Sequence, residues 1–214
     1  MKIAPLIAIV SLMAAASSSA AIMSESAFGG ASDLLVLNSS GALVSSGLAA
    51  SGFFSISDAE VTADLNAGKF SDLFATFTPI VSDNFVQGGT ALTSGTPVPG
   101  FYATGNTSFD PTAYIGKTIY TFITDGSSLV SPGSNYILLS FGGKLSVAAD
   151  PVAPPPTTYN VFAGDGTILL GQKGPVVHSD VAGGDFNTLQ FSVPEPSVAL
   201  LGLLGVAGLV RRRR

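Results

Sequence analysis

The centre of the chain consists of short runs of β-branched and aromatic residues separated by turn-forming residues. Residues 117–124 (KTIYTFIT) and 135–141 (NYILLSF) are apolar on both faces, as strands in the middle of a covered sheet are. Residues 188–193 alternate between polar and apolar side chains, a pattern typical of a half-buried strand. Glycine pairs punctuate the chain at 88–89, 142–143 and 183–184. This pattern restricts the body of the chain to a mainly β fold.

Further strands are predicted from the same signal at residues 33–38, 53–57, 159–163 and 167–170. The last two flank Asp165-Gly166, and both of these residues tolerate positive φ angles, so this pair of strands is a predicted hairpin. The sequence therefore favours an antiparallel arrangement of sequential strands.

One short helix is predicted after residue 57. Ser57 and Glu60 have the spacing of a capping box, Val61 and Leu65 stand four residues apart, and Gly68 can end the helix. Residues 71–77 are compatible with a second helical turn or with the start of a strand, and we favour the strand.

We expect one antiparallel β-sandwich or jelly-roll-like domain with one short helix over residues 22–193. The proline-rich stretch 149–158 is the only linker-like segment. Too few residues follow it for a second core, so we interpret it as a polyproline II crossing within this domain. The chain has no cysteine, so disulfide bonds cannot stabilise it and the hydrophobic core must do so.

The N-terminus has the three parts of a secretory signal peptide, which we assign to residues 1–21. Lys2 supplies the positive charge, residues 3–13 are mostly apolar, and residues 14–21 are only alanine and serine. Cleavage is expected after Ala20 or after Ala21, each of which has a serine three positions before the scissile bond. The expected partners of this segment are the Sec translocon and signal peptidase.

The C-terminus combines a short apolar segment with a cluster of arginines. Residues 198–210 carry no charge, and as a helix they would extend about 20 Å, against about 30 Å for the hydrocarbon core of a bilayer. Arg211, Arg212, Arg213 and Arg214 follow directly, and such a cluster prefers the cytoplasmic side. We therefore predict a marginal transmembrane helix over 198–210, with the body of the protein outside.

The last residues resemble the PEP-CTERM sorting signal of Gram-negative bacteria. The resemblance covers residues 194–214 and depends on Pro194, Glu195 and Pro196, the apolar segment and the arginine tail. It implies recognition by exosortase, a membrane-embedded transpeptidase-like enzyme that cuts near Pro-Glu-Pro. An exported protein of the cell surface, extracellular matrix or biofilm is then expected, with exopolysaccharide as a further expected partner. The Pro-Glu-Pro segment itself is expected to be extended, because proline fixes φ and disfavours helix before it.

The body offers no pattern that predicts catalysis. Its one histidine, His178, stands between neighbours that cannot form a Ser-His-Asp triad with it, since three consecutive residues do not converge. Most of its aspartates stand beside turn residues, where Asp is expected for local reasons, and no Asp-x-Asp-x-Asp calcium loop is present. We therefore expect no enzyme, no metal site and no cofactor, with calcium at a turn left open.

The charge of the body excludes a nucleic-acid partner. Residues 22–193 contain four lysines and thirteen acidic residues, a net charge of −9, which repels phosphate backbones. Two roles stay open at this point. The first is a structural or interaction role at the surface, and the second is a small glycan-binding β-sandwich that would use tyrosine platforms, for which the candidates are Tyr102, Tyr114, Tyr120, Tyr136 and Tyr159.

Overall fold

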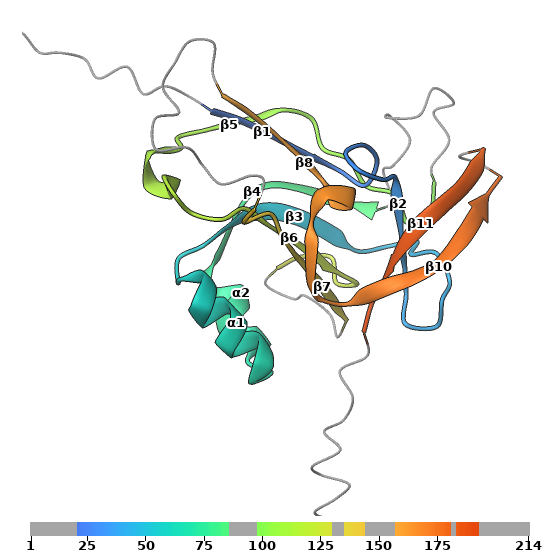
Figure 1. The fold of residues 1–214 in the computed structure, drawn as a ribbon, viewed down its shortest axis with the longest axis horizontal. Coiled ribbons are helices and arrows are strands. Elements are labelled where there is room, and N and C mark those ends of the chain that lie inside the picture. The colour runs from blue at the N-terminus through green and yellow to red at the C-terminus, as the bar shows by residue number, and fades with distance from the viewer. Residues whose placement is uncertain (1–20, 86–97, 130–134, 144–156, 181–182, 193–214) are drawn as a thin grey trace, which may run out of the picture.

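The part of the chain that the structure describes is mainly β, with three sheets and two α-helices (Figure 1). A computed structural model describes residues 21–85, 98–129, 135–143, 157–180 and 183–192. The predicted β class is thereby confirmed. The predicted signal peptide up to Ala20, the proline-rich crossing at 149–156 and the C-terminal segment from residue 193 lie outside the described residues.

The largest sheet, sheet C, lies in the middle of the molecule. It has five strands in the order β4-β3-β6-β7-β9, and all of its pairings are antiparallel. The strands are β3 (Leu48–Phe54), β4 (Phe77–Asn84), β6 (Tyr120–Thr124), β7 (Tyr136–Ser140) and β9 (Thr167–Leu170). Every residue of β3 and β6 is buried. The prediction of a central strand within 117–124 is therefore confirmed.

Sheet A packs against one face of sheet C. Its strands are β1 (Ala21–Ser26), β5 (Thr107–Phe109) and β8 (Thr158–Phe162), with β1 in the middle. The pairing of β1 with β5 is antiparallel, whereas its pairing with β8 is parallel. Alternate residues of β1 are buried, beginning with Ala21 and Met23, so this strand presents one face to the core.

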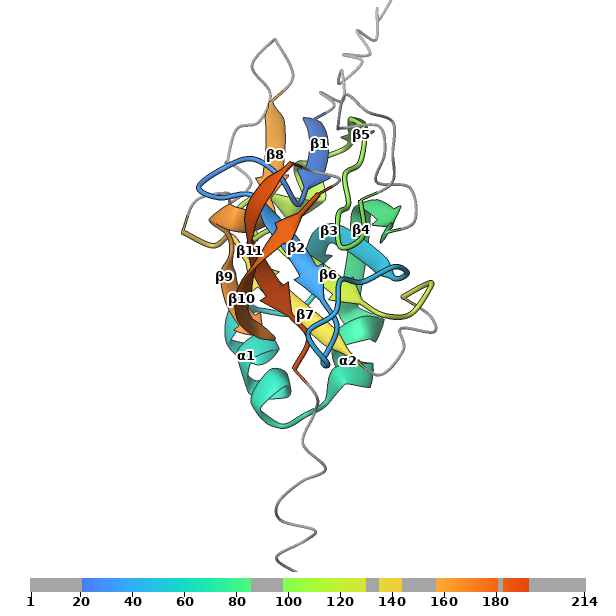
Figure 2. The same ribbon diagram turned by 90° about the vertical axis from the view of Figure 1, so that its right-hand side faces the viewer.

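Sheet B lies at the right-hand side of the molecule in Figure 1 and faces the viewer in Figure 2. It contains β2 (Leu34–Leu37), β10 (Gln172–Ser179) and β11 (Gly184–Gln190). The hairpin of β10 and β11 is antiparallel with an irregular register between Gly174 and Val177, and β11 pairs with β2 in parallel. The expectation of antiparallel pairing throughout is therefore wrong at two places, β1–β8 and β11–β2.

Two helices cover the other face of sheet C, namely α1 (Asp58–Asn66) and α2 (Phe70–Thr76). The predicted capping box is confirmed, because the Ser57 and Glu60 side chains each bond the other residue's backbone N–H. The prediction of a strand over 71–77 is wrong, since the chain stays helical up to Thr76. Phe70 and Phe74, four residues apart, both pack on Tyr136 of sheet C, which requires helical spacing.

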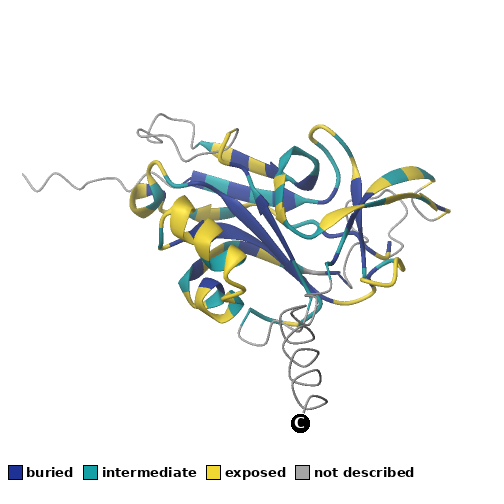
Figure 3. Ribbon diagram, turned by 60° about the horizontal axis from the view of Figure 1, so that its bottom comes forward, coloured by how far each residue is buried: buried dark blue, intermediate teal, exposed yellow. Residues whose placement is uncertain are grey.

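Sheet C separates two hydrophobic cores. The inner core lies between sheet C and sheets A and B, and it includes Phe53, Ile123 and Leu139. The helix-side core lies between sheet C and the two helices, and it includes Phe54, Leu73 and Phe122. Figure 3 shows sheet C largely buried and the outer sides of the helices exposed. Both faces of sheet C are thus covered, which explains why β6 is apolar on both faces.

The predicted hairpin at Asp165-Gly166 is wrong, because β8 belongs to sheet A and β9 to sheet C. A short 3₁₀ helix, η3 (Ala163–Asp165), carries the chain from one sheet to the other. The Asp165 carboxylate accepts a hydrogen bond from the Ala31 N–H at 2.8 Å. That bond fixes η3 to the loop before β2. A second 3₁₀ helix, η2 (Thr112–Tyr114), precedes β6.

Candidate functional site

The described residues continue to the position just before the predicted sorting motif. Phe191 is buried in the inner core, and its N–H donates to the Leu37 carbonyl at 3.1 Å. Ser192 forms an antiparallel bridge with Tyr136 and is the last described residue before the motif. Within the described ranges, the inner core and its backbone hydrogen bonds thus continue up to Phe191, three positions before Pro194.

The residues predicted for sorting and processing fall almost entirely outside the described part of the chain. These are Ala20, Pro194, Glu195, Pro196, and Arg211 to Arg214. Ala21 is the exception, and it is the fully buried first residue of β1. Within the described ranges, no helix is long and apolar enough to cross a bilayer. The predicted helix over 198–210 is outside those ranges and stays a prediction.

A carboxyl group that the sequence reasoning missed lies inside the inner core. Glu25 of β1 is only 2% exposed and bonds the Ser51 hydroxyl of β3, which is 2.6 Å from the Thr121 hydroxyl of β6. Its second oxygen, Oε1, has no hydrogen-bond partner among the described residues. Burial raises the pKa of Glu25 to about 8, the Ser51 bond lowers it, and the charge of Asp83 raises it. Its surroundings therefore favour the protonated, neutral form of Glu25.

A polar cleft of about 410 Å³ lies where α1 meets sheet C. Asp58, the first residue of α1, accepts hydrogen bonds from the Thr118 hydroxyl at 2.7 Å and the Tyr120 hydroxyl at 2.6 Å. Lys117 donates to the carbonyls of Phe54 and Ser55. Burial, and then the bond to Asp58, raise the pKa of Tyr120. These bonds are internal to the protein, so the cleft contains a tether that holds α1 against sheet C.

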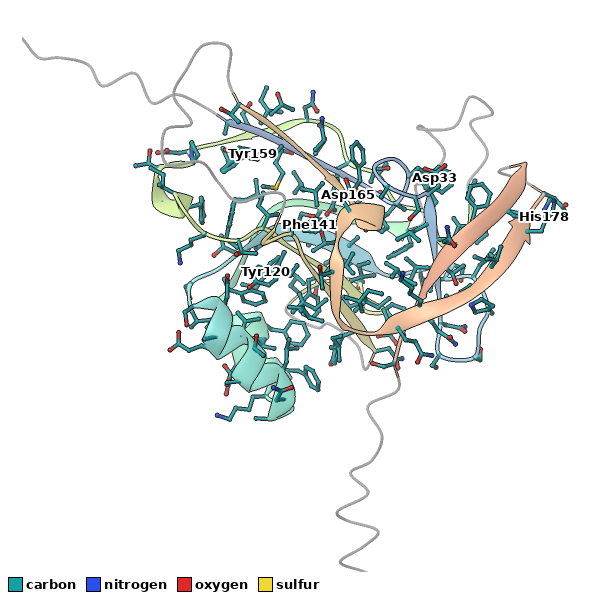
Figure 4. All side chains as sticks on the ribbon, viewed as in Figure 1. Asp33, Tyr120, Phe141, Tyr159, Asp165 and His178 are labelled. Carbon is teal, nitrogen blue, oxygen red and sulfur yellow. The ribbon has the colours of Figure 1, made fainter. Side chains whose placement is uncertain are left out.

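His178 lies in β10, on the exposed hairpin at the edge of the molecule (Figure 4). Its Nδ1 is 2.7 Å from the Asp185 carboxylate, and its Nε2 is 3.4 Å from that of Asp180. The hydrogen bond to Asp185 raises the pKa of His178. The structure places it between two exposed carboxylates, at the opposite side of the molecule from Tyr120 in Figure 4.

The tyrosines do not form an exposed platform. Tyr102, Tyr120 and Tyr159 are buried, at 1, 2 and 5% exposure. Tyr114 and Tyr136 are half-buried, and they pack on Phe53 and on Phe70 and Phe74, respectively. The tyrosine platform expected of a glycan-binding module is therefore not present, and all five rings serve packing instead.

Among the residues that the structure describes, no three His, Cys, Asp or Glu side chains gather closely enough to hold a metal ion. Asp33 and Asp165 do approach the same loop, where they accept hydrogen bonds from the N–H groups of Gly29 and Ala31. Their carboxylates thus stabilise the turn that leads into β2.

The comparisons with known proteins identify the C-terminus and leave the body unassigned. Residues 195–213 match the family described as PGF-CTERM motif, an archaeal sorting signal analogous to the PEP-CTERM signal. No curated protein and no solved structure matches the chain. The chain therefore carries a C-terminal sorting motif, of the kind that marks secreted and surface-anchored proteins. The finer assignment to the PEP-CTERM type stays a prediction.

Proposed function

We propose that this chain is an exported protein whose β-rich body is displayed at the cell surface after its C-terminal signal is processed. The observation that carries the proposal is the sorting motif at residues 195–213. The end of the fold supports it, because the last described core residue, Phe191, precedes the motif by only a few positions.

The processing enzyme is a membrane-embedded, transpeptidase-like enzyme, exosortase for a PEP-CTERM signal or its counterpart for a PGF-CTERM signal. The expectation from the sequence that Pro194 and Pro196 favour an extended segment fits this role, because a peptide chain enters a protease cleft in an extended form. Arg211 to Arg214 resist translocation and hold the apolar stretch in the membrane. The signal thus acts as a temporary anchor for the length of the processing reaction.

The body acts through structure or interaction, in a surface layer or extracellular matrix, and not as an enzyme. Its net negative charge favours neutral or cationic partners over nucleic acid. Its stability comes from two hydrophobic cores on a central sheet, as suits an exported chain without disulfides.

The sorting step is tested by replacing Pro194, Glu195 and Pro196 with alanine in the native host. We expect the variant to accumulate as an unprocessed membrane form, while the wild-type body reaches the surface fraction. Two further variants separate the role of charge from that of the motif. Replacing Arg211 to Arg214 by four lysines keeps the positive charge of the anchor, whereas replacing them by four glutamines removes it. The lysine variant should be processed normally. Unchanged processing of the alanine variant would refute the proposal.

A further inference from the structure

We propose that Glu25 is a pH-sensitive lock between sheets A and C. In its neutral form Glu25 holds β1 against β3 and β6, and in its ionised form it releases sheet A from sheet C. This role concerns the body alone and is independent of how the C-terminus is processed. The position of Glu25 makes it effective, because β1 is the middle strand of sheet A and its loss would unpair both β5 and β8.

The neutral carboxyl fits the hydroxyl groups that surround it. Its O–H can donate to the Ser51 hydroxyl, whose own hydrogen can then point to Thr121 Oγ1. The oxygen without a partner, Oε1, is then a carbonyl oxygen. An unpaired carbonyl oxygen costs far less in an apolar core than an unpaired charge does. The contacts around Glu25 therefore suit an acid that keeps its proton.

The ionised carboxylate finds no compensating charge on the elements packed around it. These elements supply the hydroxyls of Ser51 and Thr121, the carboxylate of Asp83 on β4, and Tyr102. Thr104 is also adjacent and accepts a hydrogen bond from the Glu25 N–H at 3.0 Å. No cationic side chain of the described ranges forms an ion pair with Glu25. Lys69, Lys117 and His178 bond groups elsewhere, and Lys173 belongs to β10 of sheet B. Ionisation therefore requires water to reach the carboxylate.

The raised pKa of Glu25 determines how the stability of the interface between sheets A and C changes with pH. The pKa of Glu25 is raised from 4.5 to about 8, so between these values the closed protein binds a proton that the open form has released. The closed interface is therefore fully favoured below about pH 4.5 and weakens as the pH rises towards about 8. Above about pH 8 the stabilisation that protonated Glu25 gives to the closed interface is fully lost.

The opening is confined to one side of sheet C. Glu25, Ser51 and Thr121 all face the inner core, because their neighbours on the same strand faces, Met23, Phe53 and Ile123, are members of it. The helix-side core consists of other residues, such as Leu73 and Phe122. Ionisation of Glu25 thus loosens sheet A while α1 and α2 stay packed on sheet C.

Hydrogen exchange on the full-length chain in detergent tests this lock. The measurement compares amide protection at pH 5 and pH 9 after correction for intrinsic exchange rates. We expect the opening constant of β1, β5 and β8 to rise by about two to three orders of magnitude, with little change in α1. In Glu25→Gln, which keeps the shape and a hydrogen bond to Ser51, the rise should disappear.

Substitutions at two neighbours of Glu25 should move the pH midpoint of sheet A opening in opposite directions. Ser51→Ala removes a hydrogen bond that stabilises the ionised form, so the transition should move to higher pH. Asp83→Asn removes a negative charge that disfavours ionisation of Glu25, so the transition should move to lower pH.

The matched control is Glu60→Gln, which changes an exposed carboxyl on α1 and should leave the protection of sheet A unchanged. Equal pH profiles for wild type and Glu25→Gln would overturn the proposal, as would an infrared spectrum without a protonated carboxyl band at pH 6.

Discussion

His178 is the only histidine of the chain, so its titration can be followed without assignment. Its hydrogen bond to Asp185 raises its pKa above 6.5, and the charge of Asp180 contributes in the same direction. The stabilisation from this pair is present below the ordinary histidine pKa, and it is lost as the pH rises through the raised value.

A proton NMR titration of the His178 ring should therefore give a midpoint above 6.5. Asp185→Asn should lower the midpoint towards that value, and Asp180→Asn should lower it less, because Asp180 lies farther from the ring. A wild-type midpoint at or below 6.5 would contradict the observed pairing.

Contacts between residues close in sequence could be predicted from the sequence, whereas contacts between distant strands could not. The capping box at Ser57 depends on neighbours in sequence, and its spacing alone predicted it correctly. Glu25 was missed because its partners, Ser51 and Thr121, come from distant strands. One signal was present, since Glu25 follows Ala21 and Met23 at alternate positions, and such positions face the core in a half-buried strand.

At the scale of elements, the tether between α1 and sheet C decides how the helix pair is attached. Replacing Asp58 by alanine leaves the Thr118 and Tyr120 hydroxyls without their acceptor. Hydrogen bonds to charged groups contribute about 1.5–3 kcal/mol, and a negative charge at a helix N-terminus adds a smaller amount. We expect Asp58→Ala to lower the free energy of unfolding by about 2 kcal/mol, measured by chemical denaturation.

The matched control is Asp72→Ala in the first turn of α2, where the side chain is exposed. Its effect should stay within about 0.5 kcal/mol, as for most surface substitutions. If both variants lost the same stability, the hydrogen bonds of Asp58 would not be what fixes α1.

Strand existence was easier to predict than strand pairing. Residues within 117–124 and 135–141 form β6 and β7 because runs of buried β-branched and aromatic residues fit only a covered sheet. Residues 71–77 were misjudged, since a short aromatic run fits either a strand or one helical turn until its packing partner, here Tyr136, is known. Asp165-Gly166 has good turn chemistry, but a turn does not determine which sheet the next strand joins.

At the scale of the whole molecule, both ends of the body meet the predicted processing segments. Ala21 belongs to the inner core and pairs with Phe109, whereas Phe191 closes the other end. Cleavage after Ala20 keeps every residue of β1, and cleavage after Ala21 would remove one core side chain. We therefore expect the mature chain to begin at Ala21.

The parallel pairings β1–β8 and β11–β2 join segments far apart in the sequence. They bring the start of the body beside residues 158–162, and β2 beside the last strand. Contacts of this kind follow from the complete packing of three sheets and not from local patterns. The predicted class of the fold was therefore right, while its topology was not accessible from the sequence.

The central claim is that the C-terminal segment is a temporary anchor, removed before the body is displayed. Mass spectrometry of peptides from the surface-exposed protein of the native host tests it directly, with membrane precursor as the internal reference. We predict an N-terminal peptide that starts at Ala21 and a C-terminal peptide that ends near Pro194-Glu195-Pro196. Surface protein that retains Arg211 to Arg214 would contradict the account.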